Sequence, residues 1–420
     1  MEPRVSGSRW WVVFASVLGL LVGQGPINIF AFAVFLKPVS EGLGIGRGTL
    51  SSGVFVGSLV AAVGSPIVGR LIDRWGIRPV LLPAIVAYAL ATAAMALLSP
   101  AAAVLYGLFA LAGLTGAAQL PTPYAKAIAE WFDHQRGLAL GIAMAGTGLG
   151  IALIPQWAAL LIRHFGWRAA YVGLGVAVFV IAFAPVAAFV RDAYPPAGAG
   201  RSRTGAGHAA IPGVTAREAL TGSWRFWALL VAFLFGAAAI NGTLTQVVAL
   251  LTDRGLPAQY ATAALSSAGL ALIGGRVFSG FLLDRIFGPY VAVFFLLCPM
   301  AGIGLLASGM AGPVPVLGVI LCGVGIGAEV DLMAFFASRY FGLRAFGEIY
   351  GYLICILSVG TGLGPFLMGR SFDLLHSYRP MLLGFEIMLA IACLLLVRLG
   401  PYPYPAPRTP DRRVIAAQPD

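Results

Sequence analysis

The chain has 420 residues, of which 59% are hydrophobic and only 10% are charged. Because soluble domains carry about 25% charged residues, this composition excludes an ordinary soluble protein. Apolar runs of roughly 18 residues or more without charges are typical of membrane-spanning helices, and the sequence contains about twelve of them. We therefore expect an all-α membrane protein.

The net charge of +11 would also suit a nucleic-acid-binding protein. The placement of the positive residues along the chain distinguishes that class from a membrane protein. If the spans alternate in direction, the segments on the side of the N-terminus hold roughly 19 Lys and Arg residues, and the opposite loops hold about seven. Such a bias is typical of cytoplasmic loops. We expect both termini in the cytoplasm of a multi-pass plasma-membrane protein, such as one of a bacterial inner membrane, with the lipid bilayer and not nucleic acid as its partner.

The apolar runs fall into two groups of six. The expected spans of the first group are 10–36, 49–71, 79–98, 101–127, 137–162 and 168–190. The expected spans of the second group are 226–251, 260–283, 290–309, 313–338, 347–371 and 381–399. The first run is too long for a cleaved signal peptide. The polar stretch 191–225 predicts a cytoplasmic linker, in which TAREAL suits a short amphipathic helix, and the Pro-rich tail 400–420 is predicted to be disordered.

Reactive and metal-binding groups are sparse. The four cysteines stand singly in different apolar runs: Cys298, Cys322, Cys355 and Cys393. Their spacing suits neither a metal site nor a disulfide framework. The chain also lacks a nucleophile, a base and an orienting group at a usable spacing. We expect no metal, no cofactor and no enzymatic activity.

Short motifs recur in the same order about 210 residues apart, which indicates two homologous halves. The recurring pairs are GRLIDRWG (69–76) with GFLLDRIFG (280–288), WF (131–132) with YF (340–341), and GTGLG (146–150) with GTGLG (360–364). In GTGLG the outer glycines have the GxxxG spacing that lets two helix backbones approach each other. We interpret both copies as helix-packing sites.

The first of these motifs carries a family resemblance. The pattern G-x-L-x-D-R-x-G-x-R at 69–78 resembles the loop signature of the major facilitator superfamily. The resemblance covers the whole chain and implies twelve transmembrane helices in two pseudo-symmetric six-helix bundles, 1–190 and 226–399. It further implies alternating access, in which the two bundles rock around a central cavity.

The resemblance also implies that charged groups at the cytoplasmic rim act as a gate in the outward-facing state. The alternative is that the arginines only anchor the loops at the membrane surface, and surface ion pairs are individually weak. The candidate gating residues are Asp73, Arg74, Arg78, Arg136, Asp284, Arg285 and Arg344.

Charged residues inside spans cost about 2.5 to 3.5 kcal/mol each on insertion scales and therefore mark functional sites. Arg276 lies eight residues before Asp284, which places it about 12 Å inside the cytoplasmic end of its helix. A guanidinium at that depth needs a carboxylate partner. That partner is either the substrate or an acidic residue of the chain, and a purely structural ion pair is the alternative.

Two acidic residues, Glu329 and Asp331, lie ten and eight residues before Arg339, at nearly the depth of Arg276. Two positions apart, they point about 200° from each other on a helix, so at most one faces the cavity. The other pairs with a neighbouring helix or binds a proton, because a low-dielectric surrounding favours the neutral carboxyl. Both are candidate proton-coupling residues. Glu386 belongs to a span that the family places at the periphery, so we expect a structural role.

Uncharged polar residues in spans one, four and seven are further candidates for substrate binding beside Arg276. The family resemblance implies that these spans, with span ten, line the cavity. The candidates are Gln24, Asn28, Gln119, Tyr124, Asn241 and Gln246. For each of them, an interhelical hydrogen bond is the alternative. Gly23, Gly25 and Pro26 also predict a kink in span one.

An arginine in span eight and a tyrosine in span four resemble the monocarboxylate porter and oxalate/formate exchanger group. The chain departs from that group at Leu272, where proton-coupled members show an acidic or amide residue. Span 347–371 also lacks the lysine of the dicarboxylate exchangers. One cavity cation neutralises a monoanion better than a dianion. We expect a monomeric secondary transporter that carries a small organic anion, a monocarboxylate, in symport with protons.

Two other functions fit the same sequence. Proton-driven efflux of amphipathic drugs or other small molecules would use Glu329 or Asp331 as the proton site. A membrane receptor would keep the fold without net flux of a solute.

Overall fold

The computed structural model describes residues 8–132, 136–190, 213–283, 285–310, 312–342 and 345–404. These residues form 11 helical segments long and apolar enough to cross a membrane. The longest segment, Ala139–Phe189, is interrupted at Gly166, whose φ of 79° and ψ of 166° are not helical. Because this segment holds two spans, the described chain contains the twelve spans that the sequence predicts.

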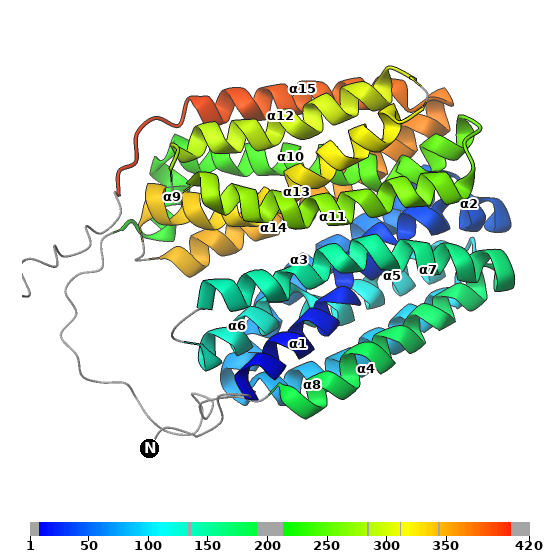
Figure 1. Cartoon of the computed structure of the whole chain (residues 1–420), viewed down its shortest axis with the longest axis horizontal. Helices are drawn as coiled ribbons and strands as arrows, with labels where there is room; N and C mark the ends of the chain where they lie inside the picture. Colours follow the sequence, from blue (N-terminus) through cyan, green and yellow to red (C-terminus); the bar gives the residue numbers. More distant parts are fainter. Residues whose placement is uncertain are drawn as a thin grey trace, which may run out of the picture.

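The helices gather in two groups that follow the two halves of the chain (Figure 1). The N-terminal half contains α1 (Ser8–Leu21), the π-helix η1 (Gly25–Phe30), α2 (Phe32–Leu43), α3 (Arg47–Trp75), α4 (Ile77–Ala94), η2 (Met95–Leu97), α5 (Ala102–Gly116), η3 (Ala117–Gln119), α6 (Pro121–Trp131), α7 (Arg136–Val178), η4 (Phe179–Phe183) and α8 (Ala184–Phe189). The C-terminal half contains α9 (Ala216–Gly222), α10 (Trp224–Asp253), α11 (Ala258–Leu283), α12 (Gly288–Ala307), α13 (Val314–Phe341), α14 (Phe346–Leu375) and α15 (Arg379–Val397).

We call the face at which α1 begins and α15 ends the terminal face, and the face at which α2 ends and α3 begins the opposite face (Figure 1). The first span reaches the opposite face through a break at Val22 and Gly23, followed by η1. This break confirms the kink that Gly23, Gly25 and Pro26 predict, since glycine and proline weaken the helical hydrogen-bond ladder.

The linker contributes one short helix, α9, as the TAREAL segment predicts. Its N-terminus has a capping box, in which Thr215 Oγ1 accepts from the Glu218 amide and the Glu218 carboxylate accepts from the Thr215 amide. The Val214 amide then donates to the Phe341 carbonyl at the end of α13. Residues 191–212 of the predicted linker and the tail beyond 404 lie outside the described residues.

Buried apolar side chains form a core inside each half, and one cluster also joins the halves. In that cluster Phe30 and Val34, from the first span, pack with Leu244 and Val247 of α10 and with Leu265 of α11. All these positions lie in the part of the spans nearer the opposite face. The halves are therefore held together there by hydrophobic burial.

Two helix pairs form the seam between the halves, α3 with α14 and α7 with α11. In the first GTGLG copy, Gly146 and Gly150 face the backbone of α1 in the same half. The middle glycine, Gly148, faces the other half, where an added Cβ would lie 2.8 Å from the Gly269 carbonyl oxygen of α11. The outer glycines of the motif thus pack within the N-terminal half, and the middle glycine packs against the C-terminal half.

The second copy repeats this division. Gly360 and Gly364 face α10 within the C-terminal half, and a Cβ on Gly364 would lie 2.8 Å from the Gly242 nitrogen. Gly362 faces α3 of the other half, where a Cβ would lie 2.8 Å from the Phe55 Cα. These contacts confirm the packing interpretation and place one glycine of each copy on the seam.

Substitutions at an outer and at the middle glycine should have different effects, the first on the stability of the C-terminal half and the second on the contact between the halves. Gly364→Val forces α14 away from α10, and overpacking of this kind costs about 1–3 kcal/mol, so we expect a lower unfolding temperature. Gly362→Val should leave each half folded but separate α3 from α14. The measurement pairs thermal unfolding with thiol cross-linking of Ser51→Cys to Gln246→Cys, two positions whose side chains meet at 3.0 Å across the halves, in a background without the four native cysteines.

In Gly362→Val we expect cross-linking to fall while the unfolding temperature stays near that of the parent. Equal losses of thermal stability in the two variants would contradict the assignment of Gly362 to the seam between the halves.

Candidate functional site

The charged centre of the C-terminal half is an ion pair between α11 and α13. Arg276 Nε lies 3.3 Å from Asp331 Oδ2, as an ion pair rather than an aligned hydrogen bond. The Arg276 side chain is 17% exposed and that of Asp331 is 37% exposed, so the pair is only partly buried. The contact confirms that the two residues lie at matching depth. It also gives the intramembrane guanidinium a carboxylate partner.

Glycines bring these two helices close enough for the pair to form. A Cβ on Gly327 of α13 would lie 2.8 Å from the backbone nitrogen of Arg276, and one on Gly275 of α11 would collide with the backbone carbonyl of Val324. The backbones therefore touch directly beside the ion pair. A bulkier residue at either glycine would move Arg276 away from Asp331.

Tyr350 on α14 lies close enough to this centre for the Asp331 and Arg276 charges to act on its phenol, which is partly buried. Sequence reasoning missed Tyr350 because span 347–371 was searched for a second cation only. The sequence did offer one signal for it, a polar aromatic residue inside a predicted span. The three side chains together offer one cation, one carboxylate and one hydroxyl.

Glu329 points away from this centre, as its spacing from Asp331 requires. It is 8% exposed, its Oε1 has no hydrogen-bond partner, and it lines a cavity of about 20 Å³ with Phe233, Gly236 and Phe295. These neighbours belong to α10 and α12. Glu329 is therefore a buried carboxyl inside the C-terminal half, without contact to Arg276.

The polar candidates of the N-terminal half lie in small groups. The Tyr124 hydroxyl donates to Gln119 Oε1 at 2.9 Å, while Gln119 Nε2 is buried without a partner. Gln24 and Asn28 line a cavity of about 10 Å³ together with Ser58. The Gln24 side-chain oxygen there is also without a partner. These amides retain hydrogen-bonding capacity that a ligand in the path could use.

The two candidates on α10 are bonded to the protein. The Asn241 amide donates to the Ala237 carbonyl of its own helix at 3.0 Å. Gln246 Nε2 donates to Ser51 Oγ at 3.0 Å and to the Pro365 carbonyl at 3.3 Å, which links α10 to α3 of the other half. Gln246 thus contributes to the seam in this conformation.

Of the predicted gating residues, Arg78 donates to the Ala187 carbonyl of α8. Arg285 lies over the Phe281 ring at 3.7 Å from its centroid, and Arg74 is exposed. The side chains of Asp73 and Arg136, and all of Asp284 and Arg344, lie outside the described residues. The gating role of this loop stays a prediction.

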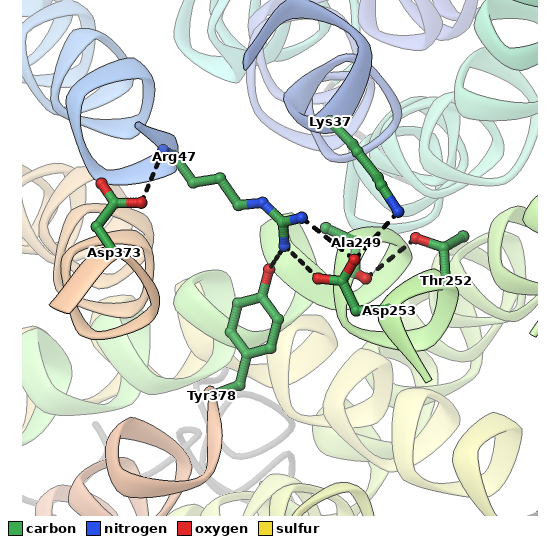
Figure 2. Close-up of polar contacts among 7 residues, drawn as sticks. All are labelled: Lys37, Arg47, Ala249, Thr252, Asp253, Asp373 and Tyr378. Carbon is green, nitrogen blue, oxygen red and sulfur yellow. Dashed lines mark hydrogen bonds and ion pairs between the residues drawn. The ribbon is translucent and has the colours of Figure 1, made fainter. Parts of the chain in front are cut away.

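A polar cluster joins the two halves at the opposite face, and we call it the latch: Lys37, Arg47, Asp253, Asp373 and Tyr378 (Figure 2). Lys37 Nζ lies 3.1 Å from Asp253 Oδ1, and the Arg47 guanidinium bonds the same carboxylate. Arg47 also donates to the Tyr378 hydroxyl. Burial raises the pKa of the Tyr378 phenol, so it accepts this bond as a neutral group.

Asp373 adds a helix cap that crosses between the halves. Its carboxylate accepts from the backbone amides of Arg47 at 2.9 Å and of Gly48 at 2.8 Å, at the N-terminus of α3. The residue before α3, Gly46, has no side chain to cap the helix itself. A carboxylate at a helix N-terminus is favourable by about 0.5–2 kcal/mol. The C-terminal half therefore supplies a cap that the N-terminal half lacks.

In the latch the cations and amide donors belong to the N-terminal half, and the acceptors belong to the C-terminal half. The attraction is thus directed across the seam. Sequence reasoning missed these residues because they stand at the ends of spans. Lys37 and Arg47 were counted there only as part of the charge bias.

Neutralising Asp253 should weaken closure at the opposite face. Hydrogen bonds to charged groups contribute about 1.5–3 kcal/mol each, so Asp253→Asn should shift the closed–open balance by roughly 10-fold or more. The measurement is the labelling rate of Ser58→Cys by a membrane-impermeant thiol reagent added at the opposite face. Glu41→Gln, which removes an exposed carboxylate from the same face, is the matched control.

We expect faster labelling in Asp253→Asn than in Glu41→Gln, and faster labelling of the parent at high salt, because salt screens partly exposed pairs. Equal labelling in the two variants would exclude Asp253 from closure.

The chain matches known transporters along most of its length. The model of the Major Facilitator Superfamily matches residues 18–365. Monocarboxylate transporter 11 of Homo sapiens is 26% identical over 326 residues, which cover 74% of this chain and 66% of that protein. Monocarboxylate transporter 13 of Bos taurus is 27% identical over 90% of this chain and 86% of its own length. The MFS-type transporter YcxA of Bacillus subtilis is 24% identical over 94% and 95%.

A solved structure shows the same fold. The bacterial homologue of the human lysosomal transporter Spinster, in an inward-facing and occupied conformation, superimposes with a TM-score of 0.68. The match covers 94% of this chain and 97% of that chain at 15% sequence identity. With twelve spans in two halves and a family match over most of its length, this protein belongs to the major facilitator superfamily and is a multi-pass membrane transporter, not an enzyme.

Proposed function

We propose that the protein is a secondary active transporter that carries a small organic anion, a monocarboxylate, together with a proton by alternating access. The observation that carries this proposal is the ion pair of Arg276 with Asp331. A monocarboxylate has the same charge and the same two oxygens as the Asp331 side chain. It can therefore replace Asp331 on the guanidinium in a bidentate pair.

This exchange of partners would couple the anion to a proton. When Arg276 binds the substrate, Asp331 loses its neutralising cation in a partly buried position. A carboxylate without a cation in a low-dielectric surrounding binds a proton more readily. The loaded centre then holds one guanidinium, one substrate carboxylate and one neutral Asp331. Its net charge equals that of the empty centre, so loaded and empty carriers face a similar cost of crossing between states.

The relatives support the substrate class. Two of the proteins described above are named as monocarboxylate transporters, at 26% and 27% identity. We propose that the Tyr350 hydroxyl, on which the charges of the pair act, donates to the substrate carboxylate. We propose that Tyr124, Gln119, Gln24 and Asn28 of the N-terminal half form the other wall of the path.

The proposed orientation follows the positive-inside bias, with both termini in the cytoplasm of the plasma membrane. The opposite face is then the external face, and the latch holds it closed in this conformation. Opening outwards would require Asp253 and Asp373 to release Lys37, Arg47 and the N-terminus of α3. The predicted loop at 69–78 would then close the cytoplasmic side. We propose that a monomer carries out this cycle.

Efflux of amphipathic compounds is the second candidate, and the buried carboxyl of Glu329 favours it. Glu329 lies among Phe233 and Phe295 with an unpartnered oxygen, which suits a protonatable group. Its cavity of about 20 Å³ holds no drug-sized ligand, so the drug would bind elsewhere. The two candidates therefore differ in which carboxyl couples the proton.

Separate substitutions of Arg276 and Asp331 should distinguish binding of the anion from its coupling to the proton gradient. In vesicles with an inward proton gradient, Arg276→Gln should lower the uptake of a labelled monocarboxylate such as lactate or benzoate by roughly 10-fold or more. Asp331→Asn should keep anion-for-anion exchange but lose the acceleration by the proton gradient. Glu329→Gln, a matched change at a carboxyl that does not touch Arg276, should keep proton-driven uptake.

Parent-like uptake in Arg276→Gln would contradict the assignment of the substrate carboxylate. Loss of coupling in Glu329→Gln with retention in Asp331→Asn would favour the efflux candidate, to be checked by drug resistance of an overexpressing strain.

A further inference from the structure

A large cavity lies at the opposite face, and Arg276 is not among its lining residues. Its volume is about 770 Å³, within the range of small-molecule sites. It opens between α2 and α7 of the N-terminal half and α10 and α11 of the C-terminal half. The polar residues that line it are Lys37, Glu41, Gln156, Arg163, Thr252, Gln259 and Thr262.

The cavity adjoins the latch through a shared residue. Lys37 lines the cavity, and its Nζ lies 3.1 Å from Asp253 Oδ1 in the latch (Figure 2). Thr252, another lining residue, directly precedes Asp253 on α10. A ligand in the cavity can therefore reach the Lys37 ammonium group directly.

The lining favours an anion with a small apolar body. Lys37 and Arg163 outnumber the single carboxylate, Glu41, so the charged lining carries one net positive charge. The side-chain amides of Gln156 and Gln259 offer further donors. Apolar side chains, among them Val34, Leu160 and Val248, complete the walls. Cations and amide donors within apolar walls match a carboxylate joined to a short hydrocarbon or an aromatic ring.

We propose that this cavity is an outer anion site, which takes a small organic carboxylate from the water at the opposite face and holds it on Lys37 and Arg163. The site rests on the proposed function, because it would present the same class of anion to the path before the latch opens. It is separate from Arg276, which lies deeper in the C-terminal half.

Occupation of this site would weaken the latch. An anion on Lys37 competes with Asp253 for the ammonium group, which leaves Arg47 as the remaining cation on that carboxylate. A ligand that binds better when the latch is loosened shifts the population towards the open form. By linkage, loosening the latch raises the affinity of the site for the anion by the same factor.

Equilibrium binding to a variant without the central arginine tests the proposal. Purified Arg276→Gln protein in phosphatidylcholine nanodiscs is titrated with radiolabelled benzoate. Added to this background, Arg163→Gln removes a lining cation that lies outside the latch. Arg168→Gln removes a nearby cation just beyond the break at Gly166, one whose guanidinium lies over the Trp167 ring and which does not line the cavity. Size-exclusion profiles and unfolding temperatures establish that each variant is folded.

We expect benzoate to bind the Arg276→Gln protein, with a dissociation constant that rises at least 10-fold on adding Arg163→Gln and is unchanged on adding Arg168→Gln. Lys37→Gln together with Arg163→Gln should abolish the binding. No binding to folded Arg276→Gln protein, or equal affinities with and without Arg163, would overturn the proposal.

A second arm separates dissolved anions from lipid headgroups, which share the same charge. In nanodiscs that contain phosphatidylglycerol, benzoate affinity should stay within about twofold of the value in phosphatidylcholine. Loss of benzoate binding there would overturn the proposal and assign the cavity to an anionic lipid. The two proposals fail through different results. Parent-like uptake by Arg276→Gln would contradict the proposed transport function, whereas the outer anion site is judged only by the effect of Arg163→Gln on benzoate binding.

Discussion

The ion pair between Arg276 and Asp331 imposes the strongest constraint on this structure. A guanidinium inside a membrane span is costly unless a carboxylate neutralises it. To meet that need, α11 and α13 must approach closely enough for the side chains to touch at 3.3 Å. Gly275 and Gly327 allow the approach, since a Cβ at either would collide with the facing backbone. The close packing of α11 against α13 is thus matched to the needs of one charged pair.

The inner pair and the latch have complementary places in the fold. The inner pair lies within one half, so Arg276 can exchange Asp331 for a substrate without pulling the halves apart. The latch crosses between the halves, with Lys37 and Arg47 on one side and Asp253 on the other. The middle glycines, Gly148 and Gly362, provide the smooth contact on which the halves can move. Binding and closure are therefore carried by different charges, which the outer cavity at Lys37 would connect.

The sequence predicted features that depend on local spacing. Hydropathy predicted twelve spans, glycine and proline predicted the kink after Leu21, and helix rise predicted the matching depth of Arg276 and Asp331. The spacing of Glu329 and Asp331 predicted that they face apart, but not which one meets the arginine. That choice depends on helix rotation, which the packing of α13 against α11 and α12 sets.

The latch could not be predicted in the same way. Arg47 and Asp253 are separated by 206 residues, and their meeting depends on which span ends become neighbours across the seam. Asp373 caps α3 over 326 residues, so no local capping motif signals it. The charge bias predicts only which face is cytoplasmic, and it rests on the many positive residues of the terminal face. It gives no function to the few cations of the opposite face, although Lys37 and Arg47 form the contact between the halves.

The exchange of Asp331 for a substrate carboxylate on Arg276 is tested most directly by counting protons during binding. Isothermal titration of the purified protein with a monocarboxylate, repeated in buffers of different ionisation enthalpy, gives the number of protons taken up per anion. The exchange predicts an uptake of about one proton per anion at full coupling in the parent and none in Asp331→Asn. Anion binding without proton uptake in the parent, or unchanged uptake in Asp331→Asn, would contradict it.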